Sequence, residues 1–234
     1  MRTERASLPG VAVVIPTLNE ARTIAVGLQR ILAEAPDELV VIDGGSRDET
    51  VSLVKSAGVR VLESPRGRAD QQNRGAESTS SEILLFLHAD CHLEPGSLLH
   101  LRQYMSDHPG ISGGCFRMIV ESDDWRFRAI NRAADIRAGV IGIPYGDQGI
   151  FVRRTLFNRL GGFPVVPLME DVFLSLKIRG LGRIAVLPKR IFVSPRRWQS
   201  RGLIYQTLLN WCLTIAAAAH VSPEHLARYY PPIR

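Results

Sequence analysis

The chain has 234 residues, 45% of them hydrophobic, so it can bury a sizeable core in one large α/β domain or two small ones. Its 29 Lys and Arg residues outnumber the 23 Asp and Glu, giving a formal charge of +6. This balance suits phosphate-bearing partners, because guanidinium groups bind phosphate oxygens in pairs. Nucleic acid is not the expected partner, because the sequence has no basic stripe interleaved with aromatic residues and no recognised nucleic-acid motif.

The cysteines and the first residues indicate a cellular compartment. Cys91, Cys115 and Cys212 are far apart and form no C-x-x-C pair, which predicts neither a disulfide framework nor a structural zinc site. Residues 1–10 are charged and lack the apolar segment of a secretory signal peptide. Both patterns predict a protein of the reducing cytoplasm.

In the first ninety residues, short apolar runs alternate with helical patterns. The runs cover residues 11–15, 38–42, 59–62 and 83–87, with amphipathic stretches at 21–35 and 46–57 and a polar helix after the turn at 64–68. Ser46 and Glu49 have capping-box spacing, so the second helix is expected to begin there. The alternation is typical of βαβ units with right-handed crossovers. We therefore predict an α/β fold with a mostly parallel central sheet flanked by helices.

The second half of the chain predicts further helices at residues 96–107, 125–137 and 170–179, and strands at 115–120, 149–152, 182–187 and 191–193. The most apolar window, residues 203–219, is shorter than the roughly twenty residues that span a bilayer core. Trp211, between Arg201 and Arg228, leaves three positions open for this helix: on the domain, on a second subunit of a homodimer, or as a peripheral contact on a membrane surface. We predict a domain of residues 1–200 and a C-terminal helical appendage of residues 201–234.

Polar side chains follow four of the predicted strands or the turns after them: residues 17–20, Asp43, residues 68–73, and the pair His88 and Asp90. The carboxyl ends of parallel strands meet at one edge of a sheet, so these groups are expected to line one cleft. Arginine and carboxylates on one rim suit a metal-bound diphosphate, since a divalent cation lets acids lie beside phosphate oxygens. The alternative for Asp90 is that it only caps the following helix.

Four pieces of the sequence occur in an order that matches a known family. The pieces V-V-I-P-T-L-N-E, V-I-D-G-G-S-R-D-E-T, L-F-L-H-A-D and M-E-D-V closely resemble the family 2 glycosyltransferases of GT-A fold, over residues 11–198. The segments G-R-A-D-Q-Q-N-R-G, P-Y-G-D-Q-G-I-F-V-R-R and R-R-W resemble a bacterial subgroup with mostly unassigned acceptors. The resemblance implies a Rossmann-like, inverting, hexosyltransferase-like enzyme of the EC 2.4 class. Its donor would be a UDP- or GDP-sugar, and its acceptor a lipid or a small molecule.

The resemblance also implies the donor side of the site. Asp90 would hold Mg²⁺ or Mn²⁺, but His88 replaces the first Asp of the family's D-x-D motif, and Ser194 lies near the place of a late His that many members use as a further metal ligand. The nucleotide would lie against residues from the N-terminal half: Pro16, Thr17, Asn19, Glu20, Asp43, Arg68, Asn73 and His88.

The pair Glu170 and Asp171 resembles the family's E-D pair, in which the Asp is the catalytic base. An acceptor hydroxyl must lose a proton as it attacks the anomeric carbon, and a positioned carboxylate accepts it. Glu170 would orient the acceptor or its loop. Without the other motifs, the macrodipole that favours acids at a helix start would be the preferred explanation of both residues. The residues that would face the sugar, the acceptor or the pyrophosphate are Gly146, Asp147, Gln148, Arg197 and Trp198.

Other classes of protein fit the sequence less well. A sugar nucleotidyltransferase or a dinucleotide oxidoreductase would carry a glycine-rich signature after its first strand, where this chain has P-T-L-N. A nucleotide-sugar-binding protein that has lost turnover stays open, because His88 replaces a carboxylate and the late His is absent.

Overall fold

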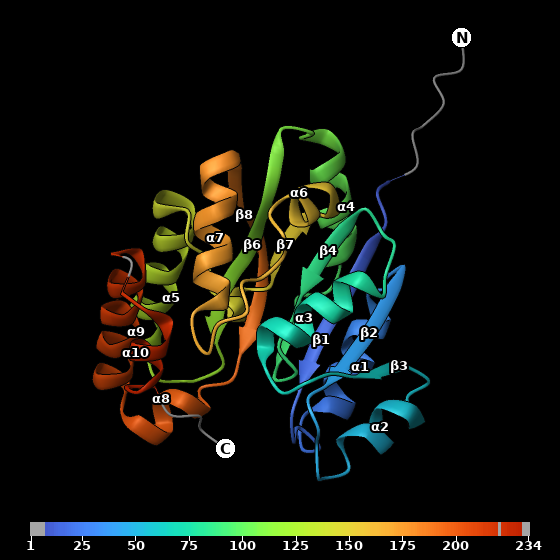
Figure 1. Ribbon diagram of the computed structural model, residues 1–234, viewed down its shortest axis with the longest axis horizontal. Coiled ribbons are helices and arrows are strands. Elements are labelled where there is room, and N and C mark those ends of the chain that lie inside the picture. Colours follow the sequence, from blue (N-terminus) through green and yellow to red (C-terminus); the bar gives the residue numbers. More distant parts are fainter. Residues whose placement is uncertain (1–7, 220, 231–234) are drawn as a thin grey trace.

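The computed structural model describes residues 8–219 and 221–230, which build one eight-stranded mixed sheet between layers of helices (Figure 1). The strand order is β3-β2-β1-β4-β7-β6-β8-β5. The strands are β1 Val11–Thr17, β2 Glu38–Asp43, β3 Arg60–Glu63, β4 Ile83–Phe86, β5 Cys91–Leu93, β6 Ile111–Val120, β7 Ile150–Arg153 and β8 Arg183–Val193.

Helices connect most of the strands and cover both faces of the sheet (Figure 1). Helix α5 continues into a π-helical turn, η1 (Arg137–Ile141), and a 3-10 turn, η2 (Gly146–Gln148), precedes β7. The helices are α1 Ile24–Ala33, α2 Thr50–Ser56, α3 Arg68–Glu77, α4 Ser97–Asp107, α5 Phe127–Ile136, α6 Arg154–Arg159, α7 Glu170–Leu181, α8 Arg196–Arg201, α9 Leu203–Ala218 and α10 Pro223–Ala227.

Strand directions determine which loops meet. β3, β2, β1 and β4 are parallel neighbours, with Thr17 opposite Asp43 at the ends of β1 and β2. β7 runs antiparallel to β4, pairing Phe86 with Ile150. The turn η2 that precedes β7 therefore reaches the same edge as the carboxyl ends of β1, β2 and β4.

Successive residues of the buried strands face two separate cores, as expected for a sheet that helices cover on both sides. In β1, Val11, Val13 and Ile15 face the core shared with α1, α2, α4 and α5, while Ala12 and Val14 face α3, α6 and α7. The second layer is tightly packed: a Cβ on Gly75 of α3 would lie 2.2 Å from Val14 Cγ1. Glycine at this position lets α3 approach β1 closely.

Two local predictions were wrong, and one strand was missed. The second helix begins at Thr50, because the Ser46 hydroxyl donates to Asp43 and accepts from the Asn19 amide instead of forming a capping box with Glu49. The strands expected at 182–187 and 191–193 are one strand, β8, because it pairs with β6 across an irregularity at Phe116/Arg117. The short strand β5 was not predicted, and it is held by antiparallel pairing with β8.

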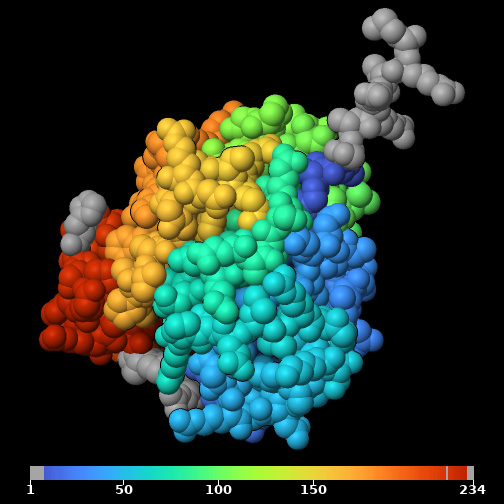
Figure 2. All heavy atoms as spheres, turned by 45° about the vertical axis from the view of Figure 1, so that its right-hand side comes forward, coloured from blue at the N-terminus to red at the C-terminus, as the bar shows by residue number. Residues whose placement is uncertain are grey.

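Helix α9 packs against α7 and makes a third apolar cluster with α10. Ile143, Met169, Val172, Leu213 and Ala217 are buried in it. In Figure 2 the C-terminal helices form one side of the molecule, beside the segment around α7. Within residues 8–219 and 221–230, the structure has no helix with the length and apolarity needed to cross a bilayer.

Candidate active site

The ends of β1 and β2 are joined by side chains rather than by backbone pairing alone. The buried Asp43 carboxylate accepts hydrogen bonds from the Gly45 and Ser46 amides, at 2.9 and 2.8 Å, and from the Ser46 hydroxyl at 2.5 Å. Thr17 donates to the Ile42 carbonyl at 3.4 Å, and Asn19 accepts from the Arg47 amide at 2.8 Å. These bonds fix the loops after both strands, beside Pro16 at the end of β1.

A group of charged side chains lies where β4 ends. Arg196 at the start of α8 donates to Asp90 at 2.8 Å and lies 3.7 Å from Glu20. Burial raises the pKa of Asp90, but His88 and the Arg196 guanidinium outweigh this effect and lower it. Burial and the nearby Asp90 raise the pKa of Glu20. One arginine thus bridges carboxylates from the loops after β1 and β4.

Gly146 lies between His88 and Asp171. Its amide donates to Asp171 Oδ2 at 2.6 Å, and a Cβ on it would lie 2.9 Å from His88 Nε2 and 3.3 Å from Asp171 Oδ2. A side chain at this position would displace one of the two groups. Burial, and then the positive charge of Arg68, lower the pKa of His88 to about 4, so its imidazole is neutral near pH 7.

Glu170 is buried beside Asp171, with 5% of its surface exposed, at the first turn of α7. Burial, and then the neighbouring Asp171, raise its pKa to about 7. Arg68, at the start of α3, approaches it at 3.9 Å. Met169 before it adopts the left-handed conformation, with φ 66°. This turn starts α7 at residue 170 and places both acids at the sheet edge.

The turn before β7 is held by polar contacts. Arg137 donates to Gln148 Oε1 at 2.8 Å, and its guanidinium carbon lies 3.1 Å from the centre of the Tyr145 ring. The Tyr145 hydroxyl is hydrogen-bonded to Thr214 of α9. Asp147, between these residues, has a buried Oδ1 without a hydrogen-bond partner among the described residues, and burial raises its pKa.

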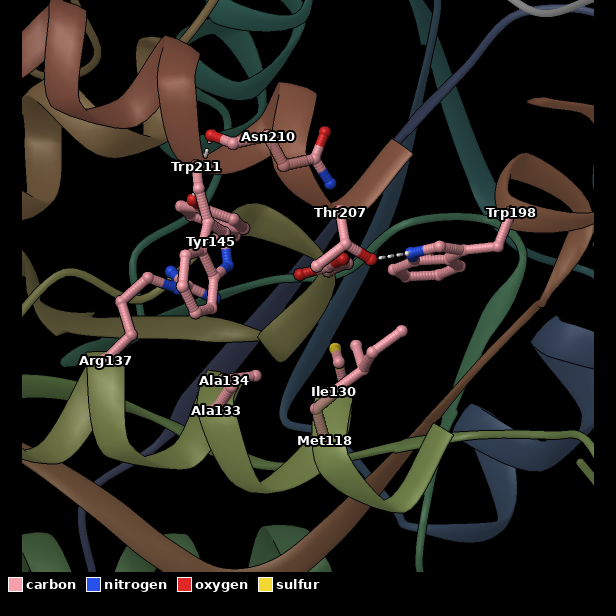
Figure 3. A pocket seen from close by; sticks show the side chains of 11 residues that line it. Met118, Ile130, Ala133, Ala134, Arg137, Tyr145, Trp198, Thr207, Asn210 and Trp211 are labelled. Atoms are coloured by element: carbon pink, nitrogen blue, oxygen red, sulfur yellow. Dashed lines mark hydrogen bonds between the residues drawn. The ribbon is translucent and has the colours of Figure 1, made fainter. Parts of the chain in front are cut away.

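A narrow cavity of about 30 Å³ lies between α5 and α9, next to Asp147 (Figure 3). Trp198 closes one end, where its indole N–H donates to Thr207 at 3.3 Å, and Arg137 and Tyr145 lie at the other (Figure 3). This volume holds about one water molecule. A larger guest must widen the cavity or place only a small group in it.

The ligand atoms of His88, Asp90 and Cys91 lie within 4.8 Å of one another. A neutral imidazole and a carboxylate are ligands for Mn²⁺ and, through the carboxylate, for Mg²⁺. Burial raises the pKa of the Cys91 thiol well above its ordinary value of 9, so the protonated form is favoured. The residues present therefore fit a divalent cation at Asp90 and His88.

The structure brings most of the predicted site residues to this edge, but some of them have other partners. Both polar atoms of the Asn73 side chain bond the Phe163 backbone at 2.9 Å, so it ties α3 to the loop before α7. Gln148 accepts from Arg137 and from the Tyr145 amide. Arg197 donates to the Tyr230 hydroxyl. Both polar atoms of Asn73 and the Oε1 of Gln148 thus have structural bonds, while the buried Gln148 Nε2 has no hydrogen-bond partner among the described residues.

Sequence reasoning left out three residues that shape the site. Arg196 belongs to the R-R-W segment, but nothing local signals its pairing with Asp90, 106 positions away. Arg137 ends the helix predicted over residues 125–137, and Tyr145 occurs in the P-Y-G-D-Q segment, but neither was predicted as a site residue. The regular polar spacing of Asn210 and Thr214 on α9 was the available sign that this helix faces a polar partner.

A parallel-stranded half with acids at its carboxyl edge, joined to the antiparallel strand β7 and to helix α7, is the arrangement of a GT-A fold. Solved structures have this fold. A mannosyltransferase from Pyrobaculum calidifontis in complex with GDP-Man and Mn²⁺ superimposes with TM-score 0.67 at 22% identity, over 89% of this chain and 61% of that one. The Staphylococcus aureus protein TarS, residues 1–349 with UDP-GlcNAc, gives TM-score 0.66 at 17% identity, over 79% and 58%.

Residues 12–161 match glycosyl transferase family 2, and the chain belongs to this family. The predicted family and fold are thereby confirmed. A PGL/p-HBAD biosynthesis glycosyltransferase of Mycobacterium bovis is 30% identical over 165 residues, which cover 66% of this chain and 63% of the relative. The match thus spans less than two thirds of the relative's length.

Proposed function

We propose that this protein transfers a sugar from a nucleotide-diphosphate sugar to an acceptor hydroxyl, with inversion at the anomeric carbon. The observation that carries the proposal is the position of Asp171. The Gly146 amide donates to this carboxylate, and Gly146 also lies beside His88 on the expected donor side. The next residue, Asp147, lines the cavity between α5 and α9. A catalytic base must reach both the donor and the acceptor. Asp171 would do so if the diphosphate binds at the sheet edge near His88 and the acceptor enters from the side of this cavity.

The loops after β1 and β2 would hold the nucleotide. Pro16, Thr17, Asn19 and Asp43 line this part of the edge, and the Asp43 carboxylate would accept a hydrogen bond from the base in place of one from the Ser46 or Thr17 hydroxyl. Two similar folds are solved with GDP-Man and with UDP-GlcNAc, which supports a GDP- or UDP-sugar as donor. Arg68, Arg196 and Arg197 supply positive charge for the diphosphate.

Asp90, with His88 beside it, would hold Mg²⁺ or Mn²⁺. Such an ion, when bound, neutralises charge on the leaving nucleotide diphosphate. Mn²⁺ accompanies GDP-Man in the Pyrobaculum structure, which supports a divalent ion at this edge. Glu20 would face the ribose, and its carboxylate contact with Arg196 keeps the arginine at the rim.

The reaction then follows from the chain's own residues. Asp171 accepts the proton of the acceptor hydroxyl while the hydroxyl oxygen forms a bond to the anomeric carbon. The bond from that carbon to the diphosphate oxygen breaks, its electron pair stays on the diphosphate, and Arg68 and Arg197 stabilise the charge. One displacement inverts the configuration. Glu170 holds the start of α7, and Asp147, Gly146 and Trp198 would contact the acceptor or the sugar.

The test is the variant Asp171→Asn, because an amide oxygen can still accept the Gly146 N–H but cannot act as the base. We expect sugar transfer and donor hydrolysis to fall by about 10²- to 10⁴-fold while GDP or UDP binding is unchanged. Asp123→Asn, at an exposed position outside the site, serves as the control and should retain full activity.

Equal rates in Asp171→Asn and the wild type would refute the base assignment. Nucleotide-sugar binding without any turnover in the wild type would instead support a binding protein that has lost activity.

A further inference from the structure

We propose that the exposed faces of α5, η1 and α9 dock on an anionic membrane surface, with these helices lying in the plane of the lipid headgroups. We define the α5/α9 face by seven exposed residues: Trp125, Ile136, Val140, Ile204, Leu208, Trp211 and Ile215. Docking at this face concerns where the protein works, so it goes beyond the proposed reaction.

The α9 part of the face is an apolar stripe. Ile204, Leu208, Trp211 and Ile215 follow one another at intervals of four, three and four residues, which places them on one side of a helix. They are 69%, 55%, 50% and 68% exposed. Side chains of this size are normally buried, and a contiguous exposed group of them marks an interaction site.

The second half of the face comes from Trp125 just before α5, Ile136 at the end of α5 and Val140 in η1. Trp125 is 72% exposed, Ile136 47% and Val140 81%. Figure 3 shows α5 and α9 facing each other across the cavity, with Trp211 on the α9 side. Trp211, which belongs to the apolar stripe of α9, thus also lines the cavity that contains Asp147.

The charged residues near this face indicate which kind of partner it binds. The sequence has no Asp, Glu, Lys or Arg from residue 202 to residue 223. On α5, Arg128 and Arg132 are exposed and make no ion pair within residues 8–219 and 221–230, while the only acid of this helix, Asp135, pairs with Arg117 at 3.1 Å. Arginine beside an apolar helix face attracts anionic headgroups.

The aromatic residues agree with this choice. Trp125, Tyr205 and Trp211 are half or more exposed, and such amphipathic rings favour the level of the headgroups. The other candidate occupant is a second copy of the chain. A two-fold contact through this face would bring Arg128 and Arg132 of both copies together. Of the acids in residues 121–135, Glu121, Asp124 and Asp135 already lie against His92, Arg126 and Arg117, and Asp123 is left to match the arginines, which disfavours the contact.

Docking has a consequence for the acceptor, and this step alone rests on the proposed function. The cavity between α5 and α9 would open toward the lipid surface, with Asp147 at its inner side. A hydroxyl on the headgroup of a membrane lipid would be the small group that this cavity admits, and it would approach Asp147 without leaving the bilayer surface. The acceptor class implied is therefore lipid-borne.

The test is co-sedimentation of the protein with phosphatidylcholine vesicles, with and without phosphatidylglycerol. We expect binding to the anionic vesicles, weakening with added salt, and a blue shift of tryptophan emission. Leu208→Glu should lower the partition coefficient by about tenfold or more, and Arg128→Gln with Arg132→Gln should remove the preference for anionic vesicles.

The matched control is Leu99→Glu on α4, because Leu99 is 51% exposed and Leu208 is 55% exposed. The control should bind vesicles like the wild type. Equal binding of Leu208→Glu and wild type would overturn the proposal, as would a soluble dimer that Leu208→Glu dissociates. GDP and UDP binding, measured in parallel, reports separately on the proposed function and should be unaffected.

Discussion

Glu170 is a buried acid that costs stability at neutral pH. Its ordinary pKa of 4.5 rises to about 7 through burial and then through the neighbouring Asp171. We consider the change Glu170→Gln, which keeps the shape of the side chain and removes its charge. Gln is neutral at every pH, so folding of the variant does not bury a charged side chain at this position.

The sign and size follow from proton binding. Between pH 4.5 and about pH 7 the folded protein holds more protons on Glu170 than the unfolded chain does, so stability falls as pH rises through this window. A pKa raised from 4.5 to about 7 corresponds to about 3 kcal/mol. The variant should therefore match the wild type near pH 4.5 and exceed its free energy of unfolding by up to about 3 kcal/mol near pH 8.

Urea unfolding at about pH 5 and about pH 8 measures this difference. Glu77→Gln is the control, because Glu77 ends α3 at an exposed position. The control should give the same stability difference between the two pH values as the wild type. The reasoning is refuted if Glu170→Gln shows no stability gain over the wild type at the higher pH.

Two further predictions concern packing and charge. Gly75→Ala should destabilise the fold by about 2 kcal/mol or more, since the new Cβ would lie 2.2 Å from Val14 Cγ1. Gly180→Ala in α7, where an added Cβ has no neighbouring atom within 4 Å, should instead stabilise by about 0.5–1 kcal/mol. Thermal unfolding measures both variants, and a stable Gly75→Ala or a destabilised Gly180→Ala would contradict this packing. Arg196→Ala should tighten binding of Mn²⁺ alone by about fivefold at most, because it releases Asp90 from a half-exposed ion pair. Calorimetric titration with Mn²⁺ measures this affinity. Weaker binding in the variant than in the wild type would contradict the idea that Arg196 and Mn²⁺ compete for Asp90.

The parallel half of the sheet was predictable because its signals are local. The run at 83–87 is continuously apolar, and β1 and β4 are buried on both faces, so periodicity alone identified them. The rule that parallel strands end at one edge then placed Asp43 and Asp90 in the same region. These inferences required no knowledge of distant partners.

The remaining features depend on contacts between distant residues. Ser46 has the spacing of a helix cap, yet its hydroxyl accepts a hydrogen bond from the Asn19 amide because the loops after β1 and β2 pack together. Asn73 has the appearance of a ligand, and its amide bonds Phe163. β5 has only three residues and exists through its pairing with β8. Local pattern cannot signal partners that lie 27 to 102 positions away in these pairings.

The central claim is that this sheet edge binds a nucleotide diphosphate with a divalent ion at Asp90. Calorimetric titration of GDP and of UDP, each with and without Mn²⁺, tests it most directly in the wild type and in Asp90→Ala. We predict binding of one diphosphate that weakens sharply without Mn²⁺ and to a similar extent in Asp90→Ala. Failure of both nucleotides to bind, or Mn²⁺-dependent binding that survives in Asp90→Ala, would contradict the claim.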